Sequence, residues 1–95
     1  MLEEDLFEDN KLPQQKIHIR IQQRNAKKNI TIIEGLDKNV VDFKKMKKDL
    51  TKKYNCFGFI NDGVIQLSGD QRNNVSNFLI SENISTKDNI VIHGF

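Results

Sequence analysis

The sequence contains few residues that cross-link or interrupt a chain, with one Cys, one Pro and no Trp in 95 residues. The single thiol, Cys56, excludes an internal disulfide and indicates a reducing compartment such as the cytoplasm. No apolar run approaches the roughly 18 residues of a membrane span, and the first residues lack the pattern of a secretory signal. We therefore expect one domain with one modest core and no membrane contact.

Catalytic and metal-binding patterns are also missing. The histidines, His18 and His93, lie far apart in the sequence, and Cys56 has no His near it. No metal-ligand spacing and no phosphate-binding glycine loop occurs, and the glycines fall at expected turns and strand ends. The sequence therefore predicts a protein that is not an enzyme and that holds no metal or cofactor.

Charge is distributed unevenly along the chain. Five of the 13 acids lie in residues 1–10, which contain no Lys or Arg, so the other 85 residues hold all 15 cations against eight acids. We expect residues 1–15 to be a disordered acidic tail and residues 16–95 to form a basic folded domain. A basic body favours a polyanionic partner, although a merely solvated lysine-rich surface would have the same composition.

Residues 16–34 have the pattern of a β-hairpin. Isoleucines alternate with polar residues, which predicts strands near 16–23 and 29–34 with one apolar face toward the core. A polar, cationic tip separates the strands and suits a phosphate backbone. The apolar positions are Ile17, Ile19, Ile21, Ile30 and Ile32, and the cations of the tip are Arg24, Lys27 and Lys28. Ile33 breaks the alternation of the second strand and leaves its register open.

A lysine-rich amphipathic helix is expected after Asp42, whose side chain can cap the first turn. Apolar residues recur at helical spacing and predict the buried stripe, whereas the remaining faces hold six lysines. Like charges repel on such a face, so it is either plainly solvated or a surface for an anion. The stripe comprises Phe43, Met46, Leu50 and Tyr54.

The rest of the chain completes a two-layer fold. A hairpin over 56–68 turns at 61–63, Asp70 caps a helix over 71–82, and an apolar last strand over 90–93 is expected to be central in the sheet. The order is β-β-α-β-β-α-β. We therefore predict an α+β sandwich with two helices on one face of a five-stranded mixed sheet.

Three ordered segments of the chain resemble eukaryotic translation initiation factor one. They read IHIRIQQRN at 17–25, IQLSGDQR at 65–72 and VIHGF at 91–95, so the resemblance covers roughly residues 16–95. The family fold, with two helices on one side of a five-stranded sheet, agrees with the order derived from the residues. The resemblance implies a monomeric cytoplasmic factor that binds rRNA of the small ribosomal subunit near the P site and promotes scanning and start-codon fidelity. Other initiation factors and initiator tRNA are further partners that it implies.

The resemblance also implies which residues form the site. The cationic hairpin tip corresponds to the family loop that meets rRNA beside the codon, and the first helix corresponds to its rRNA-facing surface. The start of the second helix carries the family signature. The implied residues are Arg24, Asn25, Lys27 and Lys28 of the tip, Lys44, Lys45, Lys48 and Lys52 of the helix, and Gly69, Asp70, Gln71, Arg72 and Gly94 of the matched signature and carboxyl end.

Two positions depart from the eukaryotic pattern. Ala26 stands where those members usually have Gly, so we expect the tip to bend differently, with Asn25 in the left-handed conformation. The hairpin around 61–63 is several residues shorter, as in archaeal and bacterial relatives. That hairpin faces initiator tRNA in eukaryotic members, so we expect weaker tRNA blocking, or discrimination through the first loop and first helix.

Two other functions stay open from the residues alone. One is a protein-interaction adaptor, carried by Leu6–Phe7 in the tail or by an exposed helix face. The other is a general RNA-binding module without specificity for the ribosome.

Overall fold

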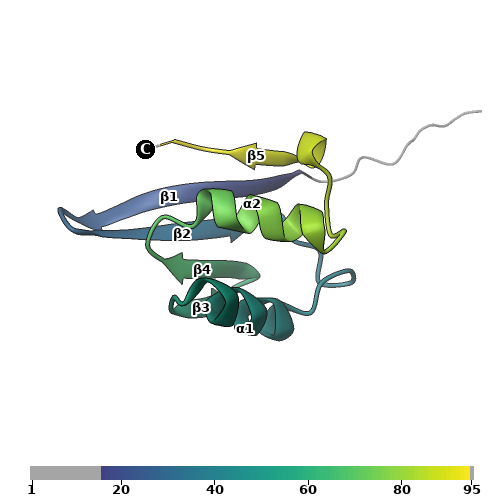
Figure 1. Cartoon of the computed structure of the whole chain (residues 1–95), viewed down its shortest axis with the longest axis horizontal. Helices are drawn as coiled ribbons and strands as arrows, with labels where there is room; N and C mark the ends of the chain where they lie inside the picture. The colour runs from purple at the N-terminus through teal and green to yellow at the C-terminus, as the bar shows by residue number, and fades with distance from the viewer. Residues whose placement is uncertain (1–15, 95) are drawn as a thin grey trace, which may run out of the picture.

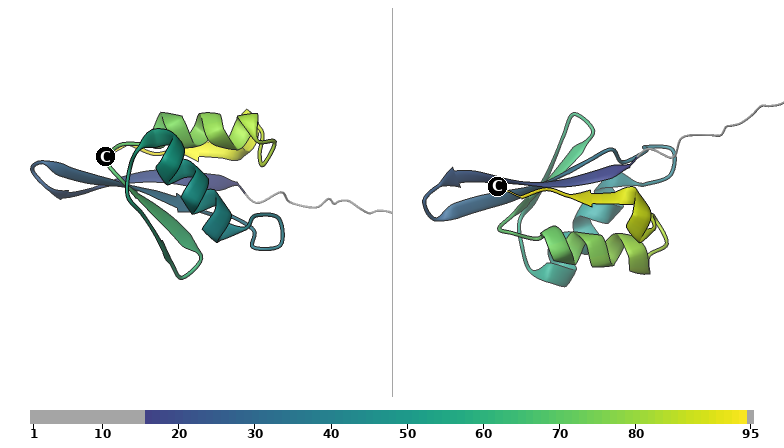
Figure 2. Two further views of the ribbon diagram at one scale, coloured as in Figure 1. Left: turned by 60° about the horizontal axis from the view of Figure 1, so that its bottom comes forward. Right: turned by 90° about the horizontal axis from the view of Figure 1, so that it is seen from above.

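The computed structural model describes residues 16–94 as a five-stranded mixed sheet with two α-helices on one of its faces (Figures 1 and 2). This confirms the expected α+β sandwich and its order of elements. The acidic tail expected at residues 1–15 lies outside the described residues. The elements are β1 (Ile17–Asn25), β2 (Lys28–Glu34), α1 (Phe43–Tyr54), β3 (Gly58–Asn61), β4 (Val64–Ser68), α2 (Arg72–Ser81), the 3-10 helix η1 (Lys87–Asn89) and β5 (Ile90–Ile92).

The strand order is β3-β4-β2-β1-β5, with β5 parallel to β1 and the other neighbours antiparallel. The expectation that the last strand is central was wrong, because β5 has only three residues and lies at one edge of the sheet. Ile90 and Ile92 are paired with Ile17 and Ile19 of β1 and lie on the same face of the sheet as those residues. Ile90 packs against the core, whereas Ile92 is 45% exposed.

The register of β2 corrects the expected hairpin pattern. Ile19 is opposite Ile33 and Ile21 is opposite Thr31, and directly opposed residues point to the same sheet face. Thr31 and Ile33 are therefore buried against the helices, whereas Ile30 and Ile32 lie on the helix-free face and are half-buried. The prediction that Ile30 and Ile32 continue the core stripe was wrong.

Both helices bury an apolar side, and that of α1 is the side that its spacing predicts. In α1, Met46 and Leu50 are buried, and the half-buried Phe43 and Tyr54 at its ends pack on the same core. Asp42 caps this helix as expected, accepting hydrogen bonds from the amides of the second and third helical residues. Helix α2 buries Val75, Phe78 and Leu79.

The start of α2 differs from the expectation that Asp70 caps a helix over 71–82. The helix begins at Arg72, and Gln71 occupies the N-cap position without a side-chain capping bond. The side chain of Asp70 still accepts from the backbone N–H of Arg72, the first helical residue, at 3.3 Å. The backbone N–H of Gln71 donates to Thr31 Oγ1 of β2 at 2.7 Å, so a local bond and a bond from the sheet together fix the beginning of the helix.

The second hairpin has the expected turn but a shorter first strand. Asp62 and Gly63 both have positive φ, 54° and 77°, as a two-residue hairpin turn requires. Strand β3 begins at Gly58 rather than at residue 56. This short, tight hairpin leaves β3 as the edge strand opposite β5.

Candidate RNA-binding surface

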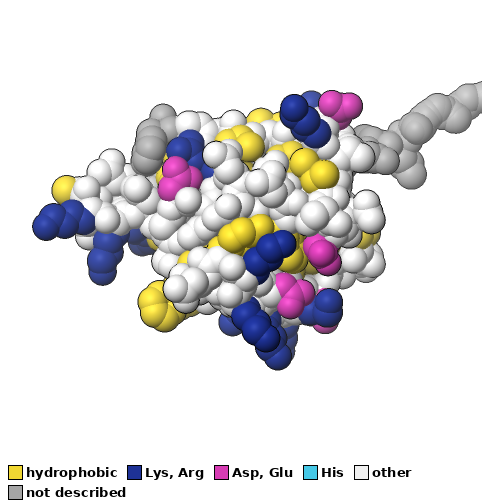
Figure 3. All heavy atoms as spheres, in the orientation of Figure 1, with side chains coloured by type: hydrophobic (Ala, Val, Ile, Leu, Met, Phe, Trp, Pro, Cys, Tyr) yellow, Lys and Arg dark blue, Asp and Glu magenta, His cyan; other side chains and the backbone are white. Residues whose placement is uncertain are grey.

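The β1–β2 hairpin extends beyond the rest of the sheet and carries cations at its end (Figures 1 and 3). Residues 22–28 hold three cations and no acid. Every predicted tip residue is exposed, namely Arg24, Asn25, Lys27 and Lys28. The paired strands hold these charges at a defined distance from the body of the protein, where they can meet a polyanion without desolvating a pocket.

The tip turns without a glycine. The backbone amide of Lys27 donates to Asn25 Oδ1 at 2.9 Å, so the Asn25 side chain closes the turn locally. Asn25 and Ala26 are not among the non-glycine residues with positive φ. The expectation that Asn25 adopts the left-handed conformation was therefore wrong, and Ala26 is accommodated without backbone strain.

Three lysines form a row along α1. Lys44, Lys48 and Lys52 are four residues apart, which is close to one helical turn, and all three are exposed. The buried residues Met46 and Leu50 lie on the opposite side of the helix. The row therefore points away from the core and concentrates positive charge on one solvent face.

Two of the other lysines of α1 have local neighbours. Lys45 Nζ lies 3.6 Å from Asp49 Oδ2, so its charge is partly balanced. Lys53 Nζ lies 5.6 Å from the ring centroid of Tyr54 and 5.9 Å from that of Phe78, within reach of cation–π attraction. Of the four predicted helix residues, Lys45 is thus the least available to an external anion.

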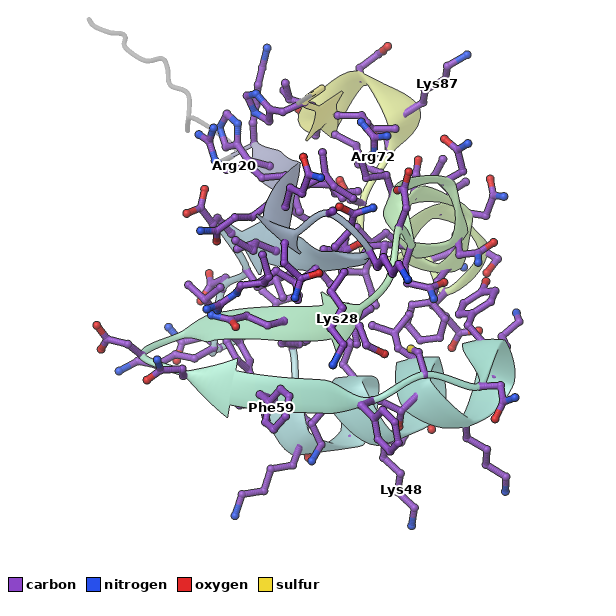
Figure 4. The ribbon with its side chains drawn as sticks, turned by 90° about the vertical axis from the view of Figure 1, so that its left-hand side faces the viewer. Arg20, Lys28, Lys48, Phe59, Arg72 and Lys87 are labelled. Atoms are coloured by element: carbon purple, nitrogen blue, oxygen red, sulfur yellow. The ribbon has the colours of Figure 1, made fainter. Side chains whose placement is uncertain are left out.

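The tip and the lysine row are two separate cationic clusters. Figure 3 shows Lys and Arg side chains gathered at the end of the hairpin and again along α1. Viewed toward the hairpin end in Figure 4, Lys28 lies centrally and Lys48 extends from α1 at the bottom. An extended polyanion could contact both clusters, whereas a small anion could contact only one.

The signature residues at the β4–α2 junction have structural contacts. Gly69 has φ of 81°, its amide donates to the Asn29 carbonyl at 2.8 Å, and its carbonyl accepts from Thr31 Oγ1 at 2.7 Å. Thr31 is fully buried and bonds both Gly69 and Gln71. This bonding ties the beginning of α2 to β2.

Asp70 and Arg72 continue this junction toward the carboxyl end. Arg72 donates to both carboxylate oxygens of Asp70, at 2.9 and 2.8 Å, and to the His93 carbonyl at 2.9 Å. Hydrogen bonds from the Arg72 side chain hold the pKa of Asp70 below its ordinary value. The pair therefore anchors the segment after β5, where Gly94 is exposed.

The structure brings together two histidines that lie 75 residues apart. His18 Nδ1 and His93 Nε2 are 2.9 Å apart, and the rings stack with centroids 5.1 Å apart. Sequence reasoning missed this contact. The contact depends on the parallel pairing of β1 with β5, which brings the two histidines together. Arg20 next to them on β1 is paired with Glu34.

The described residues show no metal or membrane site. Within residues 16–94, no three His, Cys, Asp or Glu side chains gather closely enough to hold a metal ion. Over the same part of the chain, no helix has the length and apolarity needed to cross a bilayer. Cys56 is half-buried, and this burial raises the pKa of its thiol, which opposes nucleophilic reactivity.

The fold and the two cationic clusters define a small two-layer α+β protein suited to a polyanionic partner. The family model described as "Translation initiation factor SUI1" matches residues 13–85 of the chain. The chain belongs to the SUI1 family of translation initiation factors. Its role is therefore in translation initiation, and the family confirms the expectation that the protein is not an enzyme.

Curated relatives agree with this assignment, and a solved structure has a similar fold. "Protein translation factor SUI1 homolog 2" of Arabidopsis thaliana is 49% identical over 84 residues, covering 83% of this chain and 74% of the relative. The SUI1 homolog of Salix bakko is 46% identical with the same coverage. The C-terminal domain of human eIF2D has a TM-score of 0.71 at 19% identity, over 82% of this chain and 42% of that one, and supports the fold alone.

Proposed function

We propose that this protein binds the small ribosomal subunit near the P site through rRNA and promotes scanning and start-codon fidelity. It acts in the cytoplasm as a monomer, and it leaves the subunit when initiator tRNA pairs with a start codon. The proposal rests on family membership together with one structural observation. That observation is the pair of cationic clusters, one at the hairpin tip and one along α1.

Each cluster has a distinct task in this proposal. The hairpin tip, with Arg24, Asn25, Lys27 and Lys28, reaches beyond the sheet and contacts rRNA beside the codon. The lysine row of α1 contacts the rRNA backbone and contributes most of the affinity, and Lys45 contributes less because of its contact with Asp49. Backbone contacts of this kind position a protein on folded RNA by shape and charge.

Salt-dependent binding to purified small subunits tests the contact. We compare the unchanged protein with Lys27→Glu/Lys28→Glu and with Lys44→Glu/Lys48→Glu at several salt concentrations. Each lost phosphate contact should lower the slope of log affinity against log salt by about 1, so each double variant should lower it by about 2. Affinity should fall in the same variants, because fewer counterions are released on binding.

A charge-matched control separates specific contact from net charge. Lys16→Glu/Lys87→Glu makes the same change in net charge at exposed positions away from the tip and α1, and Figure 4 shows Lys87 at the opposite end from Lys48. This control should retain nearly all affinity. Equal losses in all three variants, or equal affinity for an unrelated structured RNA, would instead indicate a general RNA-binding module.

Location and fidelity need their own measurements. Competition with the eukaryotic initiation factor one of the same ribosomes should displace the labelled protein if both occupy the P-site region. A reporter that begins with a mismatched start codon should then be translated more in cells whose protein carries Lys27→Glu/Lys28→Glu. Binding to another initiation factor without the subunit, and no effect on the reporter, would favour the adaptor function.

The short β3–β4 hairpin limits one part of the family mechanism. Its loop comprises only Asp62 and Gly63 between the paired residues Asn61 and Val64. We propose that start-codon discrimination depends on the tip and α1 more than on this loop. Asp62→Lys should therefore change reporter fidelity less than the tip variant does.

A further inference from the structure

The outer strand β3 has an open, unprotected edge. In the described part of the chain it pairs only with β4, and its residues are Gly, Phe, Ile and Asn, with no charge and no proline. Natural edge strands usually carry charged residues or proline, which block pairing with another chain. Strand β3 instead follows Phe57, which is 77% exposed, and contains Phe59, which is 65% exposed.

The pairing with β4 shows which backbone groups point outward. Ser68 donates its amide to the Phe57 carbonyl at 2.9 Å, so Phe57 directs its hydrogen bonds toward β4. In an antiparallel pair this direction alternates, so Phe59 and Asn61 also bond toward β4. The N–H and C=O groups of Gly58 and Ile60 therefore face away from β4, toward the free edge.

The two sides of this edge have different chemistry. Gly58 and Ile60 are opposite the buried Leu67 and Ile65, so they face the helix layer, and Phe57 and Phe59 face the helix-free side. On the helix side, α1 lies close against β3. A Cβ on Gly58 would lie 3.0 Å from Lys47 Cγ. Figure 4 shows Phe59 on β3 and Lys48 extending from α1 below it.

We propose that the β3 edge binds an extended segment of a partner protein in which acidic residues alternate with apolar ones. A strand added at this edge would point successive side chains to opposite faces. Acidic side chains would then face the lysines of α1, and apolar side chains would cover Phe57 and Phe59. This surface goes beyond the proposed rRNA contact, because it uses the backbone edge and the two phenylalanines.

Charge argues against a second copy of this chain as the occupant. Antiparallel pairing of two β3 edges would form one continuous sheet with both α1 helices on the same face. The lysines beside each edge would then approach those of the other copy and repel them. An acidic segment has the opposite electrostatics, and the exposed phenylalanines supply the apolar contact that RNA phosphates cannot use.

NMR titration of the full chain with a designed peptide tests the proposal. The probe is a capped peptide of about ten residues in which Asp alternates with Val, long enough to span the edge. We expect slower hydrogen exchange at the Gly58 and Ile60 amides on binding. A peptide of the same composition with acids and valines in separate blocks should bind about tenfold more weakly, because it cannot divide its side chains between the two faces.

Three variants and a control locate the contact. Ile60→Pro removes an outward N–H while leaving the ladder to β4 intact, and should abolish binding. Phe57→Thr/Phe59→Thr should weaken it at least severalfold by removing the aromatic side. Lys47→Glu/Lys48→Glu should lose affinity for the Asp–Val peptide and gain affinity for a matching Lys–Val peptide. Val40→Ser, which removes an exposed apolar residue elsewhere, should have no effect.

Four results would overturn the proposal. The first is equal affinity for the block peptide, which would indicate charge attraction alone. The second is stronger protection of the same two amides by an oligouridine, which would assign the edge to RNA. The third is protection that appears only as the protein concentration rises, which would indicate a second copy. The fourth is protection without peptide that Leu6→Ser/Phe7→Ser removes, which would assign the edge to this chain's own acidic segment.

Discussion

His18 Nδ1 lies 2.9 Å from His93 Nε2, so one hydrogen bond joins β1 to the segment that follows the edge strand β5. One nitrogen must donate and the other must accept, and this requires at least one neutral ring. Burial lowers the pKa of His93, and the positive charges of Arg20 and His18 lower it further, whereas Glu34 acts in the opposite direction. The surroundings of His93 therefore favour the uncharged form of its ring.

This relationship predicts a loss of stability in mild acid. An unfolded His has a pKa of about 6.5, and the folded pKa of His93 is lower, so below about pH 6.5 the unfolded chain binds more protons than the folded chain. The free energy of unfolding should fall as pH drops through this window and stop falling, for this group, below the folded pKa. Urea unfolding at pH 7.5 and 5.5 measures it.

His93→Gln supplies the comparison for the pH experiment, because it removes the titrating group and keeps a side chain that can hydrogen-bond. The variant should lose less stability between the two pH values than the unchanged protein. An equal loss in both would mean that another group controls the acid response.

Thr31 is the buried hydroxyl that joins the β4–α2 junction to the sheet. Thr31→Val keeps the shape but leaves the Gly69 carbonyl and the Gln71 amide without their partner. We expect the free energy of unfolding to fall by about 1–3 kcal/mol, the usual result of leaving a buried polar group unpaired. Urea denaturation measures this, and Thr31→Ser, which keeps the hydroxyl, should lose less. A loss below this range in the Val variant would show that water satisfies the Gly69 carbonyl and the Gln71 backbone amide.

Gly58 allows α1 to pack closely on β3. A Cβ there would lie 2.7 Å from Thr51 Cγ2 and 3.2 Å from Leu67 Cδ2, so Gly58→Ala should push the helix from the strand. We expect a loss of about 1–3 kcal/mol in the free energy of unfolding, as for other overpacked sites. Thr51→Ser removes the clashing methyl group, so adding it to the Ala variant should restore part of the stability. No recovery would place the strain at another contact.

The hairpin tip should lose stability when Ala26 is replaced by glycine. Because Ala26 does not have positive φ, Ala26→Gly relieves no strain and adds freedom to the unfolded chain. We expect it to lower the free energy of unfolding by about 0.4–1 kcal/mol. Hydrogen exchange at the Lys27 amide should also quicken, and it should quicken more in Asn25→Ala, which removes the acceptor of that amide. A stabilised Gly variant would contradict the observed turn.

Much of the fold follows from short-range patterns in the sequence. Alternation along 17–21, the helical spacing of Met46 and Leu50 and the Asp62-Gly63 turn each predict an element that the structure contains. The exposed cations of the tip and of α1 were predictable for the same reason, since their exposure depends on the local period of the element that carries them. Their contact with RNA stays a prediction.

Other features depend on which strands become neighbours, and no local pattern encodes that. Within residues 16–94 the apolar last strand pairs with β1 alone and therefore lies at an edge, and Thr31 is buried because it is opposite Ile21. The pairing of β5 with β1 also brings His93 to His18, and no strand in the described part of the chain pairs with the outer side of β3.

The sequence by itself determined the family, the types and order of the elements and the location of the charges, because these depend on composition and on residues near one another. Only the tertiary structure decided the register of β2, the position of β5 and the bonding around Thr31. Those outcomes come from packing two helices on one face of a five-stranded sheet, which selects one register and one strand order from several that the local patterns allow.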